Sequence, residues 1–207
     1  MPSSPALASA RELYLLDSEL TRDGRMTVLR PALPHLAQTP LWLVFRVETL
    51  DWPPEVETAL LARLARWQGA GNTVAGLQID FDARTRHLDR YAAFLAELRR
   101  RLPRRFKLSI TGLLDWSANG DPAALASLRG TVDEVVLQTY QARDTVPGYA
   151  AYFRNIAALP LPFRVGLVEG GEWRAPPALA QTPNFRGYVV FLLKPRGPSD
   201  RGRSLRH

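Results

Sequence analysis

Seven short stretches of the chain are rich in β-branched and large apolar residues, and helical patterns separate them. Most are too apolar to alternate between a core and solvent, which is typical of parallel strands covered on both faces. We therefore expect seven parallel strands. They occupy 12–20, 41–50, 73–82, 107–114, 133–141, 163–169 and 187–194.

Amphipathic helices are predicted between these strands. Apolar residues recur at helical spacing within 55–68 and 86–102. Asp121 and Pro122 are typical of the N-cap and first position of a short helix, and Pro147 opens a further helical pattern. Because strands and helices alternate along the chain, the sequence predicts an α/β fold with a parallel sheet.

The fold we predict is a (β/α) TIM-barrel-like domain. A closed barrel of this type has eight strands, so seven recognisable strands indicate a barrel that is incomplete or open. A doubly wound sheet is the alternative, but no G-x-G-x-x-G or Walker motif follows a strand. We expect a flexible N-terminus over 1–11, one domain over 12–195 and a disordered basic tail over 196–207.

Polar side chains recur on one side of several predicted strands. In LQIDFD (77–82), Gln78, Asp80 and Asp82 alternate with apolar residues. Because side chains alternate along a strand, the polar set should face the barrel interior and rise toward the carboxyl ends, where barrel active sites lie. The other strands contribute Asp17, Glu19, Arg46, Glu48, Ser109, Thr111, Gln138 and Tyr140 in the same manner.

Asp80 and Asp82 are the candidate catalytic carboxyls. At i, i+2 spacing their Cα atoms should lie about 6.5–7 Å apart on one face. Such close like charges raise the pKa of one member when water is excluded, which makes a carboxyl able to act as a general acid at neutral pH. The alternatives are a structural pair held by Arg46 or by backbone amides, and a divalent metal site.

Metal, cofactor and nucleophilic-triad chemistry have little support in the sequence. The chain has no cysteine, which excludes disulfides and cysteine zinc sites, and no G-x-S-x-G motif. We predict no metal and no cofactor. The three histidines lie in or beside predicted helices or at the last position, and they are His35, His87 and His207.

Three tryptophans each follow a predicted strand, namely Trp52, Trp116 and Trp173. Beside carboxylates at a barrel mouth, such rings can stack on sugar faces; the alternative is that they only cover the end of the barrel. Trp42 and Trp67 lie inside a predicted strand and helix, where core packing is expected.

Charge and hydropathy narrow the possible partners. The formal net charge is +7, but the basic residues gather in 99–107 and in the C-terminal tail, without interleaved aromatic residues. We therefore expect no nucleic-acid partner. No apolar run approaches the ~20 residues of a membrane helix. No secretory signal is visible, so the expected location is cytoplasmic by default, with export if an upstream segment is missing.

Five segments carry a resemblance to a known family. The chain resembles an uncharacterised bacterial family, domain-of-unknown-function family 3142, over about residues 12–196. This resemblance implies a fold more than an activity, and family members tend to begin with one further strand. The segments are GLQIDFDA (76–83), LSITGLLDW (108–116), VDEVVLQTYQARDTVPGY (132–149), PFRVGLVEGGEW (162–173) and FRGYVVFLLKP (185–195).

A more distant resemblance links the chain to the chitinase-like glycosidases of glycoside hydrolase family 18. Their D-G-x-D-x-D-x-E motif falls on 75–82, which places Asp80 at the substrate-orienting position and Asp82 at the acid position. A later M-x-Y motif resembles Gln138-Thr139-Tyr140. The chain departs from the pattern at Gln78, which replaces a carboxylate, and at Asp82, which is one methylene shorter than glutamate.

Three functions remain open from the sequence. In the first, a glycoside hydrolase, Asp82 protonates the leaving oxygen, and Asp80, Glu48 or Glu169 is the nucleophile, base or orienting group. The second is a carbohydrate-binding or degenerate barrel, and the third is a scaffold without a ligand. The expected partner is a carbohydrate or another small polar ligand. The expected substrate-binding residues are Gln78, Arg46, Glu48, Trp116, Gln138, Tyr140, Glu169 and Trp173.

Overall fold

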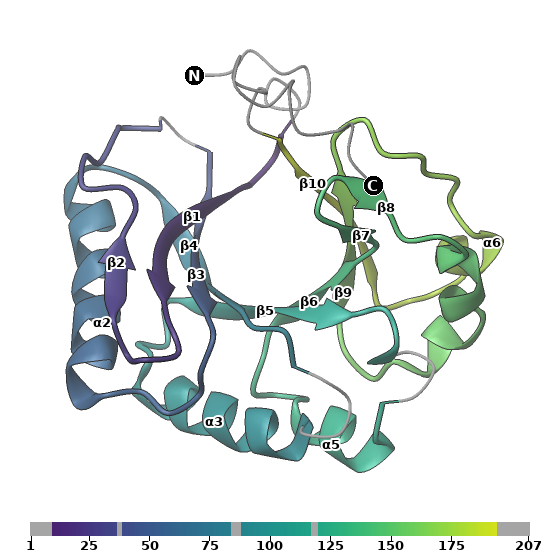
Figure 1. The fold of residues 1–207 in the computed structure, drawn as a ribbon, viewed down its shortest axis with the longest axis horizontal. Coiled ribbons are helices and arrows are strands. Elements are labelled where there is room, and N and C mark those ends of the chain that lie inside the picture. The colour runs from purple at the N-terminus through teal and green to yellow at the C-terminus, as the bar shows by residue number, and fades with distance from the viewer. Residues whose placement is uncertain (1–9, 37–38, 84–87, 117–119, 194–207) are drawn as a thin grey trace, which may run out of the picture.

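The computed structural model describes residues 10–36, 39–83, 88–116 and 120–193. Residues 1–9 of the predicted N-terminal segment 1–11, and the whole predicted tail 196–207, therefore lie outside the described residues. One curved sheet dominates the fold, with the strand order β10-β9-β6-β5-β4-β3-β1-β2. Figure 1 shows this sheet curving around a central space, with helices on its outer side.

Seven strands of this sheet are parallel, and each overlaps one predicted segment. They are β1 (Leu13–Leu20), β3 (Leu41–Val47), β4 (Val74–Asp80), β5 (Lys107–Leu113), β6 (Glu134–Gln138), β9 (Phe163–Val168) and β10 (Phe185–Phe191). The α/β, TIM-barrel-like prediction is confirmed. Among the described residues, no strand joins β10 to β1, so the sheet curves round without closing.

Three short strands were not predicted as separate elements, although residues 140–141 lie within the segment 133–141 that was predicted as one strand. The strand β2 (Met26–Val28) pairs antiparallel with the end of β1, and β7 (Tyr140–Gln141) pairs with β8 (Asp144–Thr145) in a small hairpin. At two to three residues each, they are too short to produce a clear pattern.

The helices cover the outer face of the sheet. They are α2 (Pro54–Gly69), α3 (Leu88–Arg101), α5 (Pro122–Ser127) and α6 (Pro177–Ala180), together with the 3-10 helix η2 (Tyr149–Ala158). As predicted, the Asp121 side chain caps α5 by accepting the amide of Ala123. The segment after Pro147 is helical, but it is a 3-10 helix rather than an α-helix.

The apolar core lies between the sheet and this outer layer. Leu77 and Ile79 of β4 are fully buried there, as the alternation predicted. Trp67 of α2 is also fully buried. The opposite set of β4 side chains therefore points into the barrel, where the polar residues are found.

A bulge in β1 changes which of its residues face inward. Leu16 pairs with Val44 of β3 and Ser18 pairs with Phe45, so Asp17 is an extra residue without a partner. The prediction that Asp17 rises with Glu19 toward the mouth is therefore wrong. Asp17 turns outward to α2, while Glu19 faces the interior.

Candidate functional site

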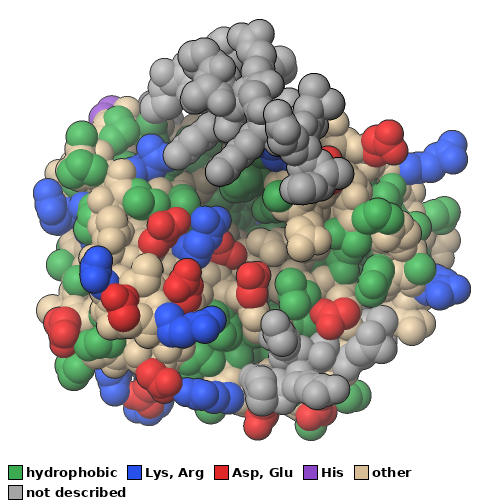
Figure 2. Space-filling view, in the orientation of Figure 1, with side chains coloured by type: hydrophobic (Ala, Val, Ile, Leu, Met, Phe, Trp, Pro, Cys, Tyr) green, Lys and Arg blue, Asp and Glu red, His purple; other side chains and the backbone are tan. Residues whose placement is uncertain are grey.

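A cavity occupies the barrel interior and opens at the carboxyl ends of the strands. Figure 2 shows a hollow in the face viewed, with acidic and basic side chains gathered beside it. Gln78, Asp80 and Asp82 all line this cavity, which is the arrangement predicted from LQIDFD. Their roles in binding or catalysis remain predictions, but a ligand in the cavity could reach their side chains.

Asp80 is the centre of a polar cluster that we call the mouth network, made of Glu19, Arg46, Asp80 and Thr111. Thr111 Oγ1 donates to Asp80 Oδ1 at 2.9 Å, and Arg46 Nε donates to Asp80 Oδ2 at 3.1 Å. Arg46 Nη1 also contacts Glu19 Oε1 at 3.3 Å. These groups come from four adjacent strands, so parallel pairing brings them to one edge.

The charges of the mouth network support one another. Partial burial would lower the pKa of Arg46, but Asp80 and Glu19 outweigh this and raise it. The Arg46 side chain is 47% exposed, whereas that of Asp80 is 13% exposed. A ligand can therefore reach the Arg46 guanidinium more easily than the Asp80 carboxylate.

Asp82 lies beyond the end of β4 and differs from Asp80 in its surroundings. Its side chain is exposed at the cavity lining. No hydrogen bond or ion pair holds it within the described part of the chain. Asp82 can therefore approach a ligand without first losing a partner among the described residues.

Tyr140 forms part of an aromatic wall at the same opening. Its ring stacks on that of Phe191 from β10, with centroids 5.4 Å apart and planes 17° apart. Burial and the nearby charge of Asp80 raise the pKa of Tyr140 to about 12, although Arg46 and a hydrogen bond with Gln138 act in the other direction. Gln138 also lines the cavity. Tyr140 therefore presents a neutral phenol to the cavity.

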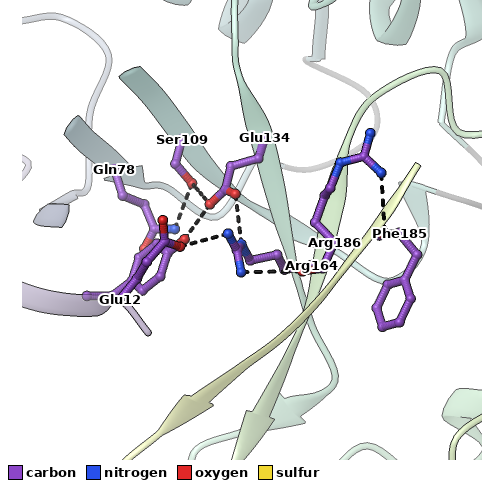
Figure 3. A network of polar contacts seen from close by, with 8 residues as sticks. Glu12, Gln78, Ser109, Glu134, Arg164, Phe185 and Arg186 are labelled. Carbon is purple, nitrogen blue, oxygen red and sulfur yellow. Dashed lines mark hydrogen bonds and ion pairs between the residues drawn. The ribbon is translucent and has the colours of Figure 1, made fainter. Parts of the chain in front are cut away.

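Deeper in the barrel lies a second cluster, the floor network, which comprises Glu12, Tyr14, Gln78, Ser109, Glu134 and Arg164 (Figure 3). Arg164 Nε binds Glu134 Oε2 at 2.8 Å, and Arg164 Nη2 binds Glu12 Oε2 at 2.7 Å. Tyr14 donates to Glu134 Oε1 at 2.5 Å. The network links strands far apart in sequence across the base of the barrel.

The floor network also fixes Gln78. Its amide donates to Ser109 Oγ at 3.0 Å, and Ser109 Oγ donates to Glu134 Oε1 at 3.2 Å. The cavity lining also includes two buried valines, Val44 opposite Gln78 and Val136 opposite Thr111.

The tryptophan predictions need correction. Trp116 is 1% exposed and lies in the core, where its ring packs edge-on against Tyr91 and its Nε1 donates to Ala83 O. Trp173 stacks on Tyr149 of η2 at 4.7 Å, and it is not among the cavity-lining residues. Trp52 packs against Phe94 of α3. Each ring finds apolar partners in the helix layer.

The two predicted outer glutamates have different positions. Glu48 lines the rim of the cavity and accepts the backbone amide of Arg22 at 3.0 Å. Glu169 follows β9, accepts the amide of Leu193 at 3.2 Å, and does not line the cavity. Glu169 therefore lies outside the cavity lining, as Trp116 and Trp173 do.

Sequence reasoning missed several cavity residues, among them Tyr14, Asp115, Arg164 and Phe191. For Arg164, the available signal was a charged residue inside the apolar strand FRVGLV, on the inward side. For Asp115, the available signal was a carboxylate two residues after a strand end.

The described residues contain no group of three metal-ligating side chains arranged to hold an ion. His35 lies beside Gly71, while His87 and His207 fall outside the described ranges. None of the described helices is long and apolar enough to cross a membrane.

Comparison with known proteins gives a family and a fold. The family model described as Domain of unknown function (DUF3142) matches residues 40–155, more than half of the chain. No curated protein matches.

Solved structures of similar fold include two with TM-scores above 0.5. The Bacillus cereus spore cortex-lytic enzyme SleL has a TM-score of 0.54 and 19% identity, over 76% of this chain and 44% of SleL. The tamarind chitinase-like lectin has a TM-score of 0.56 and 13% identity, over 87% of this chain and 83% of the lectin. This chain thus spans less than half of SleL. At these identities, the likeness establishes a shared chitinase-like barrel fold.

Proposed function

The chain belongs to the family described as Domain of unknown function (DUF3142), and from the geometry of its cavity we propose that it binds a carbohydrate and cleaves glycosidic bonds. The observation that carries this proposal is the arrangement of two β4 carboxyls. Asp80 is fixed by Thr111 and Arg46, and Asp82 stands exposed two residues further along. This difference supports a division of roles in which Asp80 orients a substrate and Asp82 reacts with it.

The composition of the cavity supports a sugar as the ligand. Sugars present hydroxyl groups for hydrogen bonds and C–H faces for stacking, and the site offers both. Arg46, Gln138 and Tyr140 supply polar groups, while the stacked Tyr140–Phe191 pair supplies an aromatic face. The two proteins of similar fold are named as a cortex-lytic enzyme and a lectin, in line with this ligand class.

The charge balance favours a neutral sugar over a polyanion. The guanidinium of Arg46 is already matched by Glu19 and Asp80. A ligand with its own carboxylate or phosphate would compete with these two groups for Arg46. A neutral oligosaccharide would accept hydrogen bonds from Arg46 without breaking the ion pairs.

The roles of the β4 carboxyls follow from their surroundings. Asp80 keeps its charge partners and orients the sugar through Thr111 and Arg46. Asp82 is in contact with water, which solvates its charged form, so it suits the role of a base that activates the attacking water. This assignment differs from the acid role that the chitinase-like motif suggested for Asp82.

The test is a panel of neutral oligosaccharides that includes chito-oligosaccharides, with binding read by calorimetry and cleavage by release of reducing ends. We expect Asp82→Asn to lose cleavage about 100-fold or more while binding changes little. Asp89→Asn is the matched control, because Asp89 is exposed on α3 away from the cavity. Failure of every sugar to bind would contradict the proposal.

A second candidate, carbohydrate binding without cleavage, has one observation in its favour. Both oxygens of Asp80 already accept hydrogen bonds, so this carboxylate is not free to act on a substrate. Under this alternative the unaltered protein binds a sugar but releases no reducing ends. The panel therefore separates the two functions directly.

A further inference from the structure

Asp115 is a cavity residue that neither the sequence motif nor the mouth network uses. It lies two residues beyond the end of β5 and lines the cavity beside Leu113 and Leu114. Along β5, Ser109 and Thr111 face the interior, where they contact Gln78 and Asp80. Asp115 thus extends the inward-facing side of β5 toward the opening.

One carboxyl oxygen of Asp115 has an unusual environment. Its Oδ1 is shielded from solvent and has no hydrogen-bond partner among the described residues. A buried, unpaired oxygen is much less costly in a neutral carboxyl than in a carboxylate. Burial accordingly raises the pKa of Asp115, and a hydrogen bond with its own backbone offsets this only in part.

Three of the carboxyl groups that line the cavity lie in three different environments. Asp80 is paired with Arg46 and Thr111, and Asp82 is exposed to water. Among the described acidic residues of the lining, Asp115 alone has a shielded, unpaired carboxyl oxygen. When carboxyl environments differ in this way, acid and base roles divide between them.

We propose that Asp115 is the proton donor for glycosidic cleavage. This assignment rests on the proposed function and supplies the acid that the β4 carboxyls lack. The proton of Asp115 moves to the glycosidic oxygen as the bond from that oxygen to the anomeric carbon breaks, with its electron pair left on oxygen. Water adds to the anomeric carbon, and its proton passes to Asp82. Exchange with solvent restores both groups.

Chain geometry is compatible with this division of roles. Asp115 is four positions after Thr111, so their Cα atoms would lie within about 13 Å even if the chain were fully extended. Because Leu114 and Asp115 form a turn, the separation is shorter than this limit. Thr111 hydrogen-bonds Asp80, so Asp115 and the β4 carboxyls border one region of the cavity.

The experiment compares substrates whose leaving groups differ in their need for a proton. For Asp115→Asn, we expect cleavage of the natural oligosaccharide to fall about 100-fold or more. Cleavage of the 2,4-dinitrophenyl glycoside of the same sugar should change only several-fold, because dinitrophenolate leaves without protonation. Asp82→Asn should impair both reactions, and the control Asp89→Asn neither.

Asp115→Ser provides a second variant with the same expected pattern, in case the asparagine disturbs the turn. Calorimetric binding of the oligosaccharide verifies that each variant is folded. Equal losses on both substrates, or full activity of the variants, would overturn the role of Asp115 while leaving the proposed function intact. Absence of cleavage by the unaltered protein, despite sugar binding, would contradict both.

Discussion

Two aspartate–arginine pairs lie in or beside strand β1, and they differ in burial and in the number of their further partners. Asp17 and Arg63 lie between the sheet and α2, with side chains 0% and 5% exposed. Asp80 and Arg46 lie at the mouth, with side chains 13% and 47% exposed. Both pairs join a strand carboxylate to a guanidinium, so the contrast comes from their surroundings.

The buried pair is enclosed by further donors. Arg63 makes two hydrogen bonds to Asp17, at 2.9 and 2.5 Å. Trp67 Nε1 donates to Asp17 at 2.7 Å, and Ser18 Oγ at 2.8 Å. Burial alone would raise the pKa of Asp17, but these hydrogen bonds together lower it. The Asp17 carboxylate is therefore saturated and closed to any ligand.

The comparison teaches that an aspartate in a barrel strand marks a site only when its partners remain accessible. Asp17 lies outward at a bulge and fastens α2 to the sheet. Asp80 lies inward and shares a cavity with exposed groups. We therefore expect substitutions at the buried pair to change the free energy of unfolding, and substitutions at the mouth to change ligand affinity.

The largest effect is expected for Arg63→Met. It leaves the charge of Asp17 buried without its main partner, which should lower the free energy of unfolding by about 3–5 kcal/mol. Urea denaturation followed by circular dichroism measures this change. A loss below about 1 kcal/mol, the range of exposed ion pairs, would break the distinction between the two regions.

A smaller loss is expected for Trp67→Phe, which removes the indole donor to Asp17 Oδ1 and keeps an aromatic ring in the core. We expect a loss of about 1.5–3 kcal/mol, as for other hydrogen bonds to charged groups. Trp52→Phe is the matched control, because its Nε1 donates only to the neutral carbonyl of Thr49. Similar losses for both variants would show that Asp17 gains little from Trp67.

The buried pair of Asp17 and Arg63 should also make the free energy of unfolding depend on pH under acidic conditions. The pKa of Asp17 is lower in the folded protein than in the unfolded chain. Its contribution is therefore present above the unfolded pKa of about 3.9 and is lost as pH falls through the folded pKa. Unfolding measured between neutral and strongly acidic pH should show a shallower decline for Asp17→Asn. If the unaltered protein and Asp17→Asn lost stability equally as the pH falls, the contribution assigned to Asp17 would be contradicted.

The smallest change in stability is expected for Arg46→Met at the mouth. Because this guanidinium is about half exposed, its removal should cost about 0–1 kcal/mol. Sugar affinity, measured by calorimetry, should instead fall about tenfold, as expected for the loss of a charge-assisted hydrogen bond. Unchanged affinity combined with marked destabilisation would reverse the comparison, making the mouth network structural.

Much of the fold was predictable because parallel strands buried on both faces leave a strong signal. The alternation in 77–82 also correctly separated Leu77 and Ile79, in the core, from Gln78 and Asp80, in the cavity. The strand β2 was missed because three residues of mixed polarity carry no period. Local patterns thus predicted the long elements and missed the short ones.

The candidate site was less predictable because its contacts are long-range. The bulge that puts Asp17 and Glu19 on opposite faces depends on pairing between β1 and β3, which no local pattern reveals. Trp116 was expected at the mouth, yet it occupies space beside Tyr91 and Gly112. Burial of a large aromatic ring in a strand–helix connection is favourable. The sequence alone does not show where in the core the space for that ring lies.

The extra residue in β1 also determines how this barrel tolerates changes in chain length. With Asp17 deleted, Leu16 and Ser18 would stay opposite Val44 and Phe45 as consecutive residues, so the pairing would become regular and Glu19 would remain opposite Arg46. Such a deletion would therefore remove the fastening of α2 while keeping an acidic partner at the cavity. The strand can thus lose one residue at this point without a change in the face that its later side chains present.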